Sequence, residues 1–300
     1  MNLYIKRDDL TPLGLGGNKT RKLEFLLGDA LAGGADTLVT VGGVQTNHGR
    51  LTAAAAAKAG LACTLVLDGA RPEKLSGNLL LDCLLGASLV YTDGRSTSAV
   101  IEETLAALQA AGRAPYFIPE GGSNAVGSAG YLAMVPELLA QADSLPVPPA
   151  RLVCTMGSLG TFAGLWLGAR AFGAPFSVTG VAVNPTTGYT REKAAALVNE
   201  MSAAYGLDIA AAPEDMDIIY ADAAHDYAGP GYNVPDAKTR GAVELLARTE
   251  GIFLDPCYTA KSFRGFCDIA RELDGGAIFV HTGGTPALWT QEHLDAFAAD

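Results

Sequence analysis

Lys19 follows three glycines and an asparagine in "GLGGNKTRKLEF", residues 14–25, and starts a helix-like segment. A glycine-rich bend that ends in lysine at a helix start is typical either of a phosphate ligand or of a reactive amine. A Walker A loop needs glycine directly before the lysine, whereas Asn18 separates Gly17 from Lys19 here. No strand of convincing length precedes the bend, so the P-loop interpretation is weak.

A second glycine-rich turn, "CTMGSLGTFAG" at residues 154–164, is a better candidate for a phosphate site. A strand-like run ends there and a helix begins, and the residues between them are Gly157, Ser158, Leu159, Gly160 and Thr161. Free backbone N–H groups at a helix N-terminus, with two hydroxyls beside them, suit a phosphate without any lysine. An ordinary strand-to-helix turn explains the same residues equally well.

The two turns together change what Lys19 is expected to do. A phosphate that is held without a lysine leaves Lys19 free for covalent chemistry. This combination indicates pyridoxal 5'-phosphate, because its aldehyde forms a Schiff base with a lysine while the protein supplies a phosphate cup and partners for the ring.

Sequence blocks from residue 5 to about residue 290 carry a specific resemblance. They read "RDDLTPLGLGGNKTRKLEFLLGDAL", "GGVQTNHGRLTAAAAAKAGL", "PGYNVP", "LDPCYTAKSFRG" and "HTGGTPALW". In this order they resemble the D-cysteine desulfhydrase and 1-aminocyclopropane-1-carboxylate deaminase family, which has the tryptophan synthase β-subunit-like fold. The resemblance implies an α/β enzyme of fold type II that binds pyridoxal phosphate, with two interleaved lobes, each holding a mostly parallel sheet flanked by helices.

The resemblance implies that Lys19 is the Schiff-base lysine and the base that handles the α-proton of the substrate. For Lys22, one helical turn away, a structural role is the better interpretation. Asn47 in "QTNH" matches the asparagine that hydrogen-bonds the ring oxygen of the cofactor. Its expected place at a strand-to-helix turn also suits capping, so binding and capping are hard to separate for this residue.

Thr46 is the main departure from the family, which usually has serine at this position. In the family that serine contacts the substrate carboxylate and, in the deaminase, is proposed as a nucleophile. The hydroxyl is kept here, but the extra methyl must fit and the β-branched side chain has fewer rotamers. His48 either contacts the cofactor ring and substrate or fills the helix start, and the structural interpretation is slightly favoured.

Two tyrosines match family positions that face the cofactor: Tyr232 in "GPGYNVP" and Tyr258 in "DPCYTAK". A tyrosine that follows Pro-Gly in a loop is poorly placed for core packing alone, and its phenol can orient or protonate a substrate. Asn233 replaces the usual glycine beside Tyr232. The segment "EGGSNAVGSAG" also matches a family loop, and its glycine-rich turn is assigned to structure.

Thr259 and Thr282 indicate the branch of the family. In the deaminase branch, a glutamate follows the second tyrosine and a leucine follows the histidine of "HTGG", whereas both positions are threonine here, as in the desulfhydrase branch. A carboxylate near the pyridine nitrogen keeps it protonated, which the opening of a cyclopropane should require. A thiolate leaves more easily, so a threonine hydroxyl should suffice for β-elimination.

The expected reaction is therefore β-elimination from a cysteine-type amino acid, with D-cysteine as the first candidate, giving pyruvate, ammonia and sulfide. Deamination of 1-aminocyclopropane-1-carboxylate and loss of sulfite from L-cysteate are the alternatives within the family. A catalytically silent cofactor-binding protein is the alternative from another class. A phosphate-binding NTPase is disfavoured by the absence of a GK[ST] motif.

Composition limits the partners. A net charge of −11 and a pI near 4.8 argue against nucleic-acid binding, and no apolar run reaches membrane-spanning length. The five cysteines are scattered without CxxC spacing, so neither a disulfide framework nor a metal site is indicated. These features predict a cytoplasmic protein that acts on a small amino-acid substrate. A homodimer is expected from the resemblance alone.

Short apolar runs alternate with longer amphipathic stretches along the 300 residues, which is typical of parallel sheets with crossover helices. Glycines follow the strand-like runs, where an α/β sheet usually places its ligand crevice. The predicted strands lie in "DTLVTVGG", "ACTLVLDG", "SLVYTDG", "PYFIPEGG", "RLVCTMGS", "FSVTGVAVN", "MDIIYADAA", "GIFLDP" and "AIFVHTGG". We expect a small lobe at residues 36–131, inserted into a large lobe formed by residues 1–35 and 132–300, with the cofactor between them. Family members usually carry an additional N-terminal segment, so we expect either a truncated start or a missing strand and dimer contact.

Overall fold

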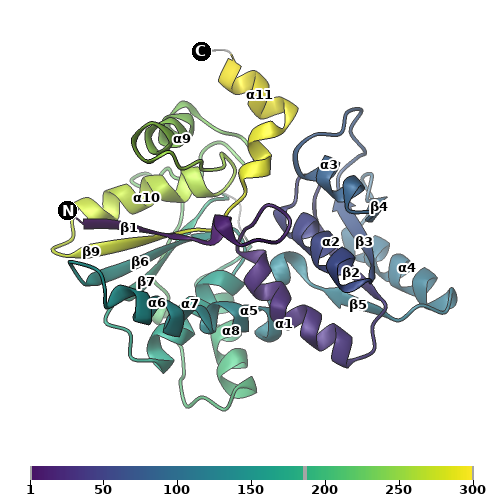
Figure 1. The fold of residues 1–300 in the computed structure, drawn as a ribbon, viewed down its shortest axis with the longest axis horizontal. Helices are drawn as coiled ribbons and strands as arrows, with labels where there is room; N and C mark the ends of the chain where they lie inside the picture. The colour runs from purple at the N-terminus through teal and green to yellow at the C-terminus, as the bar shows by residue number, and fades with distance from the viewer. Residues whose placement is uncertain (1, 185–187, 299–300) are drawn as a thin grey trace.

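The structure, a computed structural model, describes residues 2–184 and 188–298. Within these residues the strands form two separate parallel sheets, as Figure 1 shows. The larger sheet has five strands, in the spatial order β1 (Asn2–Arg7), β9 (Gly276–His281), β6 (Pro149–Met156), β7 (Ser177–Ala182) and β8 (Ile218–Ile219). The smaller sheet has four, in the order β4 (Ser88–Tyr91), β3 (Ala62–Asp68), β2 (Thr37–Gly43) and β5 (Pro115–Ile118). The predicted α/β class with two parallel sheets is confirmed.

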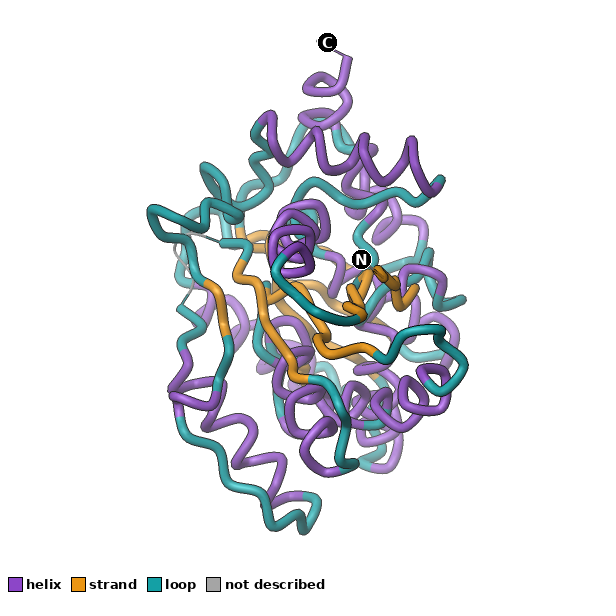
Figure 2. Tube along the Cα trace, turned by 90° about the vertical axis from the view of Figure 1, so that its left-hand side faces the viewer, coloured by secondary structure: helices purple, strands orange, loops and turns teal. Residues whose placement is uncertain are grey.

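Helices cover both faces of the larger sheet, and Figure 2 shows the strands at the inside with helices around them. One group packs on one face: α5 (Ala125–Leu132), α6 (Met134–Ala142), α7 (Gly160–Ala171) and α8 (Arg191–Ala204). The opposite face is covered by α9 (Ala237–Glu250) and α10 (Thr259–Arg271). The chain ends with α11 (Gln291–Ala298). Short 3-10 turns complete the described elements: η1 (Asp8–Leu10), η2 (Glu120–Gly122), η3 (Pro213–Asp215) and η4 (Thr285–Trp289).

The smaller sheet is flanked by α2 (Asn47–Ala59), α3 (Gly77–Leu84) and α4 (Thr97–Ala110). The first helix, α1 (Lys19–Ala32), packs against both α2 and α5 and so lies between the two sheets. It buries Leu23 and Leu26 in the core that also contains Leu38, Leu51 and Leu65 of the smaller-sheet region. The lobe boundaries near residues 36 and 131 stay a prediction.

Two strand predictions were wrong. "GIFLDP" forms no strand, because its residues lead directly into α10. The carboxylate of Asp255 accepts hydrogen bonds from the N–H groups of Tyr258 and Thr259 at the start of that helix. The segment before the glycine bend, in contrast, is strand β1, which pairs in parallel with β9 from Asn2 to Arg7. As an edge strand that carries Lys6 and Arg7, it lacks the continuous apolar run that marks a buried strand.

Candidate active site

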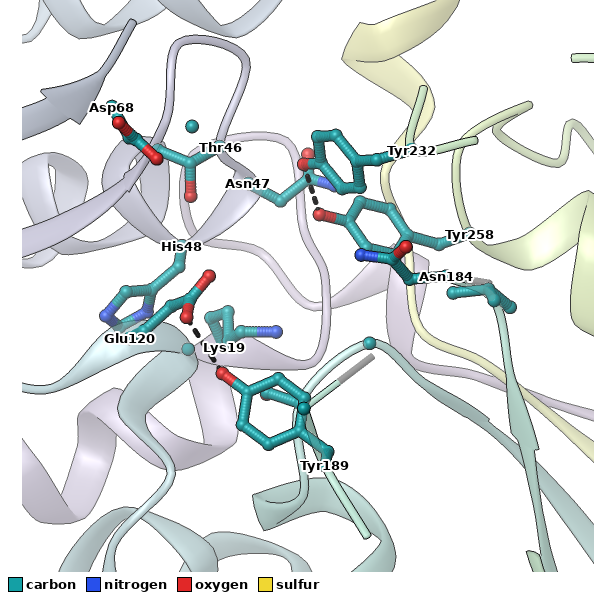
Figure 3. A pocket seen from close by; sticks show the side chains of 16 residues that line it. Lys19, Thr46, Asn47, His48, Asp68, Glu120, Asn184, Tyr189, Tyr232 and Tyr258 are labelled. Carbon is teal, nitrogen blue, oxygen red and sulfur yellow. Dashed lines mark hydrogen bonds between the residues drawn. The ribbon is translucent and has the colours of Figure 1, made fainter. Parts of the chain in front are cut away.

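A cavity of about 320 Å³ lies where the carboxyl ends of strands from both sheets meet. Parallel strands place their following loops at one edge of a sheet, which is where α/β proteins bind ligands. Figure 3 shows the labelled side chains around it. The residues lining it are Lys19, Gly43, Thr46, Asn47, His48, Asp68, Glu120, Gly121, Gly157, Ser158, Val183, Asn184, Gly188, Tyr189, Tyr232 and Tyr258.

A second cavity of about 30 Å³ adjoins the first, because the two share Asn47, Gly157, Ser158 and Tyr258. The additional residues that line this inner extension are Asn18, Thr155, Thr161, Thr282 and Gly283. The sequence prediction that Lys19, Asn47, Ser158 and Thr259 converge on one cleft therefore holds for the first three. Thr259 does not line either cavity.

Backbone conformation explains the glycines before Lys19. Residues 14–17 all have positive φ, and Leu15 is the one side-chain-bearing residue among them. A Cβ at Gly16 would come within 2.0 Å of the carbonyl oxygen of Asp9, so the bend folds back onto η1 only with glycine there. The bend delivers Lys19 as the first residue of α1.

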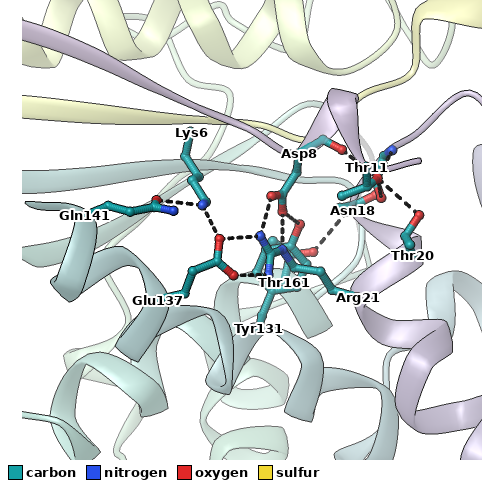
Figure 4. Close-up of polar contacts among 11 residues, drawn as sticks. Lys6, Asp8, Thr11, Asn18, Thr20, Arg21, Tyr131, Glu137, Gln141 and Thr161 are labelled. Carbon is teal, nitrogen blue, oxygen red and sulfur yellow. Dashed lines mark hydrogen bonds and ion pairs between the residues drawn. The ribbon is translucent and has the colours of Figure 1, made fainter. Parts of the chain in front are cut away.

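A polar network fixes the other side of the same bend, as Figure 4 shows. Asp8 is 1% exposed and accepts hydrogen bonds from Arg21 and, at 2.7 Å, from the Tyr131 hydroxyl. Arg21 also donates to Glu137, which pairs with Lys6. The hydrogen bonds from Arg21 and Lys6 lower the pKa of Glu137 to about 2. The bend, α1, α5 and α6 are thereby tied together.

Lys19 is linked to the glycine turn of α7 through Asn18. Its Nζ donates to Asn18 Oδ1 at 3.1 Å, and Asn18 Nδ2 donates to Thr161 Oγ1 at 3.0 Å. Burial lowers the pKa of Lys19 to about 8, while the Glu120 carboxylate raises it and Arg50 lowers it further. Near neutral pH a measurable fraction of this amine is unprotonated. Sequence analysis missed Asn18, although its place directly before the lysine at the helix start is a signal for capping or binding.

The N-terminus of α2 presents Thr46 and Asn47 to the cavity. Thr46 is the N-cap, and its Oγ1 accepts a hydrogen bond from the N–H of Gly49 at 3.3 Å. Its methyl group, Cγ2, fits because residues 42 and 49 are glycines. A Cβ at Gly49 would lie only 2.5 Å from this methyl, and a Cβ at Gly42 only 3.1 Å from it. Two glycines thus make room for the methyl of Thr46.

His48 and Lys22 are both buried next to the cavity. His48 is 3% exposed, and its Nε2 lies 2.8 Å from Thr40 Oγ1. Burial, and then the charges of Lys19 and Lys22, lower the pKa of His48 well below its ordinary value, so the ring is neutral. Lys22 donates to the carbonyl oxygen of Gly121 at 2.9 Å and to Ser123 Oγ at 3.2 Å. These contacts fit the structural interpretation of both residues, although His48 also lines the cavity.

The turn at residues 157–161 leads from β6 into α7 beside the two cavities. Gly157, Ser158 and Thr161 line them, whereas Leu159 is 6% exposed and belongs to the core. The N–H of Gly160 donates to Ser123 Oγ at 3.1 Å, and a Cβ at Gly160 would come within 2.6 Å of Lys22 Nζ. Lys22 Nζ therefore lies directly behind this helix N-terminus, where burial and the charge of Lys19 lower its pKa well below the ordinary value.

The two predicted tyrosines form one unit. The hydroxyl oxygens of Tyr232 and Tyr258 lie 2.5 Å apart, and their rings meet edge to face with centroids 5.7 Å apart. Burial raises the pKa of both phenols well above the ordinary value. Both hydroxyls therefore stay protonated at neutral pH.

Thr259 and Thr282 lie in different environments. Thr259 is fully buried, and its hydroxyl donates to Asp255 Oδ1 at 2.7 Å. Asp255 also accepts from the backbone N–H groups of Cys257, Tyr258 and Thr259. The hydroxyl proton of Thr259 is thus committed to Asp255, while Thr282 lines the inner extension.

Several residues that line the cavity were missed from the sequence. Glu120 and Gly121, in the segment that was assigned to structure alone, line the cavity. The Tyr189 hydroxyl donates to Glu120 Oε2 at 2.8 Å, and Thr92 donates to Asp68 Oδ1 at 3.1 Å. Acidic residues after strands are common on any α/β protein, so the sequence carries no signal that singles out these two.

Comparison with known proteins gives consistent matches. The sequence profile of a family described as pyridoxal-phosphate dependent enzyme matches residues 1–283. A D-cysteine desulfhydrase of Klebsiella pneumoniae subsp. pneumoniae is 42% identical over 297 residues, which cover 96% of this chain and 88% of that protein. A protein of Pyrococcus abyssi, provisionally named a 1-aminocyclopropane-1-carboxylate deaminase, is 40% identical over 294 residues, which cover 96% of this chain and 86% of that protein.

Comparison with solved structures points to the same family and fold. One described as an ACC deaminase homologue superposes with a TM-score of 0.88 at 36% identity, and the match covers 99% of this chain and 88% of that one. A fungal L-serine ammonia-lyase from Rhizomucor miehei shares the fold, at 18% identity and a TM-score of 0.67 over 99% of this chain and 92% of that one.

None of the helices in residues 2–184 and 188–298 has the length and hydropathy to cross a membrane. Nor do the described residues contain a group of three or more His, Cys, Asp or Glu side chains that could hold a metal ion.

Proposed function

Because this chain belongs to the family of pyridoxal-phosphate dependent enzymes, we propose that it catalyses β-elimination of a thiol from a cysteine-type amino acid, D-cysteine first, giving pyruvate, ammonia and sulfide. The observation that carries the proposal is the meeting of Lys19, Asn47 and the Tyr232–Tyr258 pair in one cavity. The relatives named D-cysteine desulfhydrase support the choice of substrate. Deamination of 1-aminocyclopropane-1-carboxylate is the second candidate, because a relative carries that name.

The cofactor of this family is pyridoxal phosphate, and the residues present fit it. A Cβ at Gly157 would come within 2.9 Å of the Tyr258 ring, so glycine keeps open the passage between the cavity and its inner extension. We propose that Lys19 carries the cofactor, that Asn47 donates to its ring oxygen, and that the N-terminal N–H groups of α7 hold its phosphate. When bound, pyridoxal phosphate withdraws electrons from the α-carbon of the substrate and so makes its α-proton acidic.

The substrate carboxylate is proposed to bind at the N-terminus of α2. Thr46 Oγ1 already accepts the N–H of Gly49, so its own proton is available to donate to a carboxylate oxygen. The helix dipole favours an anion at this end. Asn47 and His48 complete this part of the wall.

The proton steps are assigned to Lys19 and the tyrosine pair. Lys19 Nζ, with its pKa lowered to about 8 by burial, is suited to take the α-proton. As the Cβ–S bond breaks, the sulfur leaves with the electron pair. In the Tyr232–Tyr258 pair one hydroxyl donates to the other, which leaves one proton free for the departing sulfur. Water then hydrolyses the three-carbon product to pyruvate and ammonia.

We also propose that the protein is a cytoplasmic homodimer. The family resemblance supports the dimer, and the five unpaired cysteines support a reducing compartment. Light scattering of the purified holoenzyme tests the dimer, because a mass near 30.9 kDa contradicts it.

The test of the proposed function is a substrate panel on the purified holoenzyme: D-cysteine, L-cysteine, L-cysteate, β-chloro-D-alanine and 1-aminocyclopropane-1-carboxylate. Sulfide, sulfite, pyruvate and 2-oxobutanoate are measured, with Lys19→Ala as the inactive control. We expect sulfide and pyruvate from D-cysteine and little 2-oxobutanoate. Efficient formation of 2-oxobutanoate would favour the deaminase, and inertness toward all five would indicate a silent cofactor-binding protein.

A further inference from the structure

Arg50 is a buried cation that the steps above do not use. It lies on the first turn of α2, is 0% exposed and does not line the cavity of Lys19. Its Nη1 donates to Asn78 Oδ1 at 2.6 Å and to Asn47 Oδ1 at 3.1 Å, and its Nη2 donates to the carbonyl oxygen of Gly16 at 2.7 Å. One guanidinium therefore joins α3, the N-terminus of α2 and the bend before Lys19.

The charge of Arg50 is only partly balanced inside the protein, because burial raises the pKa of Asp82 to about 7 and this carboxyl is not fully ionised at neutral pH. Burial lowers the pKa of Arg50 to about 10, and the carboxylates of Asp82 and Asp255 act in the opposite direction, so Arg50 stays protonated at neutral pH. Asp82 is itself 0% exposed, and among the described residues neither of its carboxyl oxygens has a hydrogen-bond partner. Burying a cation in this way is costly, which argues that its contacts have a purpose beyond packing.

Arg50 determines which way the amide of Asn47 faces. A guanidinium has only donors, so the atom of Asn47 that it contacts must be the oxygen. The NH2 group then lies on the other side of the amide, where a Cβ at Gly284 would come within 3.1 Å of Nδ2. Asn47 is also a lining residue of both cavities. Without Arg50, no guanidinium would select the orientation of the amide in which Oδ1 faces residue 50.

We propose that Arg50 is a positioning residue for the cofactor: it holds Asn47 with its NH2 group toward the ring oxygen. This inference rests on the role given to Asn47 in the proposed function. A fixed donor needs no reorganisation when the cofactor binds, so its loss weakens binding. Lysine at position 50 keeps the charge but cannot make the three forked contacts at once.

A double-mutant cycle tests the proposal. The dissociation constant of pyridoxal phosphate and the visible absorption maximum are measured for the wild type, Arg50→Lys, Asn47→Ala and the double variant. We expect Arg50→Lys to weaken binding about tenfold or more in the wild type and less than about twofold when Asn47 is already alanine. It should also shift the absorption maximum, which a loss of stability alone does not do.

The same loss of affinity in both backgrounds overturns the inference, because Arg50 would then act independently of Asn47. Unchanged affinity in Asn47→Ala overturns the role of Asn47 in the proposed function and the inference with it, so the two failures are distinguished. Arg151→Lys is the matched control, since Arg151 pairs with Asp217 at the start of β6 and should leave both readouts unchanged.

Asn47→Asp is a second arm that keeps Arg50 intact, should Arg50→Lys fail to fold. Aspartate retains the oxygen that Arg50 contacts but replaces the NH2 group with a carboxylate oxygen. If the NH2 group of Asn47 donates to the cofactor, as the inference requires, Asn47→Asp weakens cofactor binding more than Asn47→Ala does. Binding as tight as in the wild type overturns the inference.

Discussion

The hydroxyl oxygens of Tyr232 and Tyr258 lie 2.5 Å apart on the wall of the cavity that holds Lys19. The first tyrosine comes from the loop before α9 and the second is the N-cap of α10. Asp255 accepts the N–H of Tyr258 at 2.8 Å, so the cap of α10 also places this ring. Since each hydroxyl contacts the other, the two are expected to act as one proton donor.

Removing either hydroxyl should therefore cost about as much as removing both. We expect Tyr232→Phe and Tyr258→Phe each to lower kcat for sulfide release from D-cysteine by about a hundredfold or more, the range for general acid–base groups, and the double variant to lose little more. Cofactor binding should change less than about threefold. Tyr205→Phe, on the half-exposed tyrosine that follows α8 as its C-cap, is the matched control. If the loss of kcat in the double variant is the product of the two single losses, the two hydroxyls do not act as a unit.

The pH dependence of cofactor attachment should report the pKa of Lys19. Attack on an aldehyde requires the unprotonated amine, and burial lowers the pKa of Lys19 from 10.5 to about 8. Below pH 8 the attachment rate to the apoprotein should rise about tenfold per pH unit, and above it should level off. Stopped-flow absorbance measures this directly. Because the Glu120 carboxylate raises this pKa, Glu120→Gln should move the midpoint to lower pH, and a midpoint near 10 in the wild type would contradict the burial of the amine.

Thr259 should be a stability residue rather than a switch between family branches. Its hydroxyl donates to the buried carboxylate of Asp255, so Thr259→Val should lower the free energy of unfolding by about 1 kcal/mol. Thr259→Glu would place a second carboxylate against Asp255 and should cost about 3 kcal/mol or more. Denaturant unfolding of the apoproteins measures both. Formation of 2-oxobutanoate from the cyclopropane substrate by Thr259→Glu would show that Thr259 does reach the cofactor.

Much of the fold was predictable because buried parallel strands leave continuous apolar runs in the sequence. Strand β1 left no such run, since as an edge strand it carries Lys6 and Arg7. "GIFLDP" misled for the opposite reason, because Leu254 is buried without any partner strand. Apolar composition reports burial and does not by itself report pairing.

The site was predictable where the local sequence carries the constraint, as in the bend before Lys19, where three of the four residues with positive φ are glycines and a Cβ at Gly16 would clash with Asp9. Contacts between distant segments left no local signal. The sequence alone could not predict that Arg50 contacts Gly16 or that Tyr189 contacts Glu120. The placement of Thr259 at the cofactor rested on a match to a family position and stays a prediction, while in the structure its hydroxyl donates to Asp255.

The most direct test of the account is to find the lysine that carries the cofactor. The holoenzyme is reduced with borohydride, digested and mapped by mass spectrometry, with Lys22→Met as the control, since Lys22 is the buried amine one helical turn away. The account predicts a pyridoxyl label on Lys19 in both the wild type and the control, and none in Lys19→Ala. A label on Lys22, or a wild-type protein that takes up no cofactor, would contradict it.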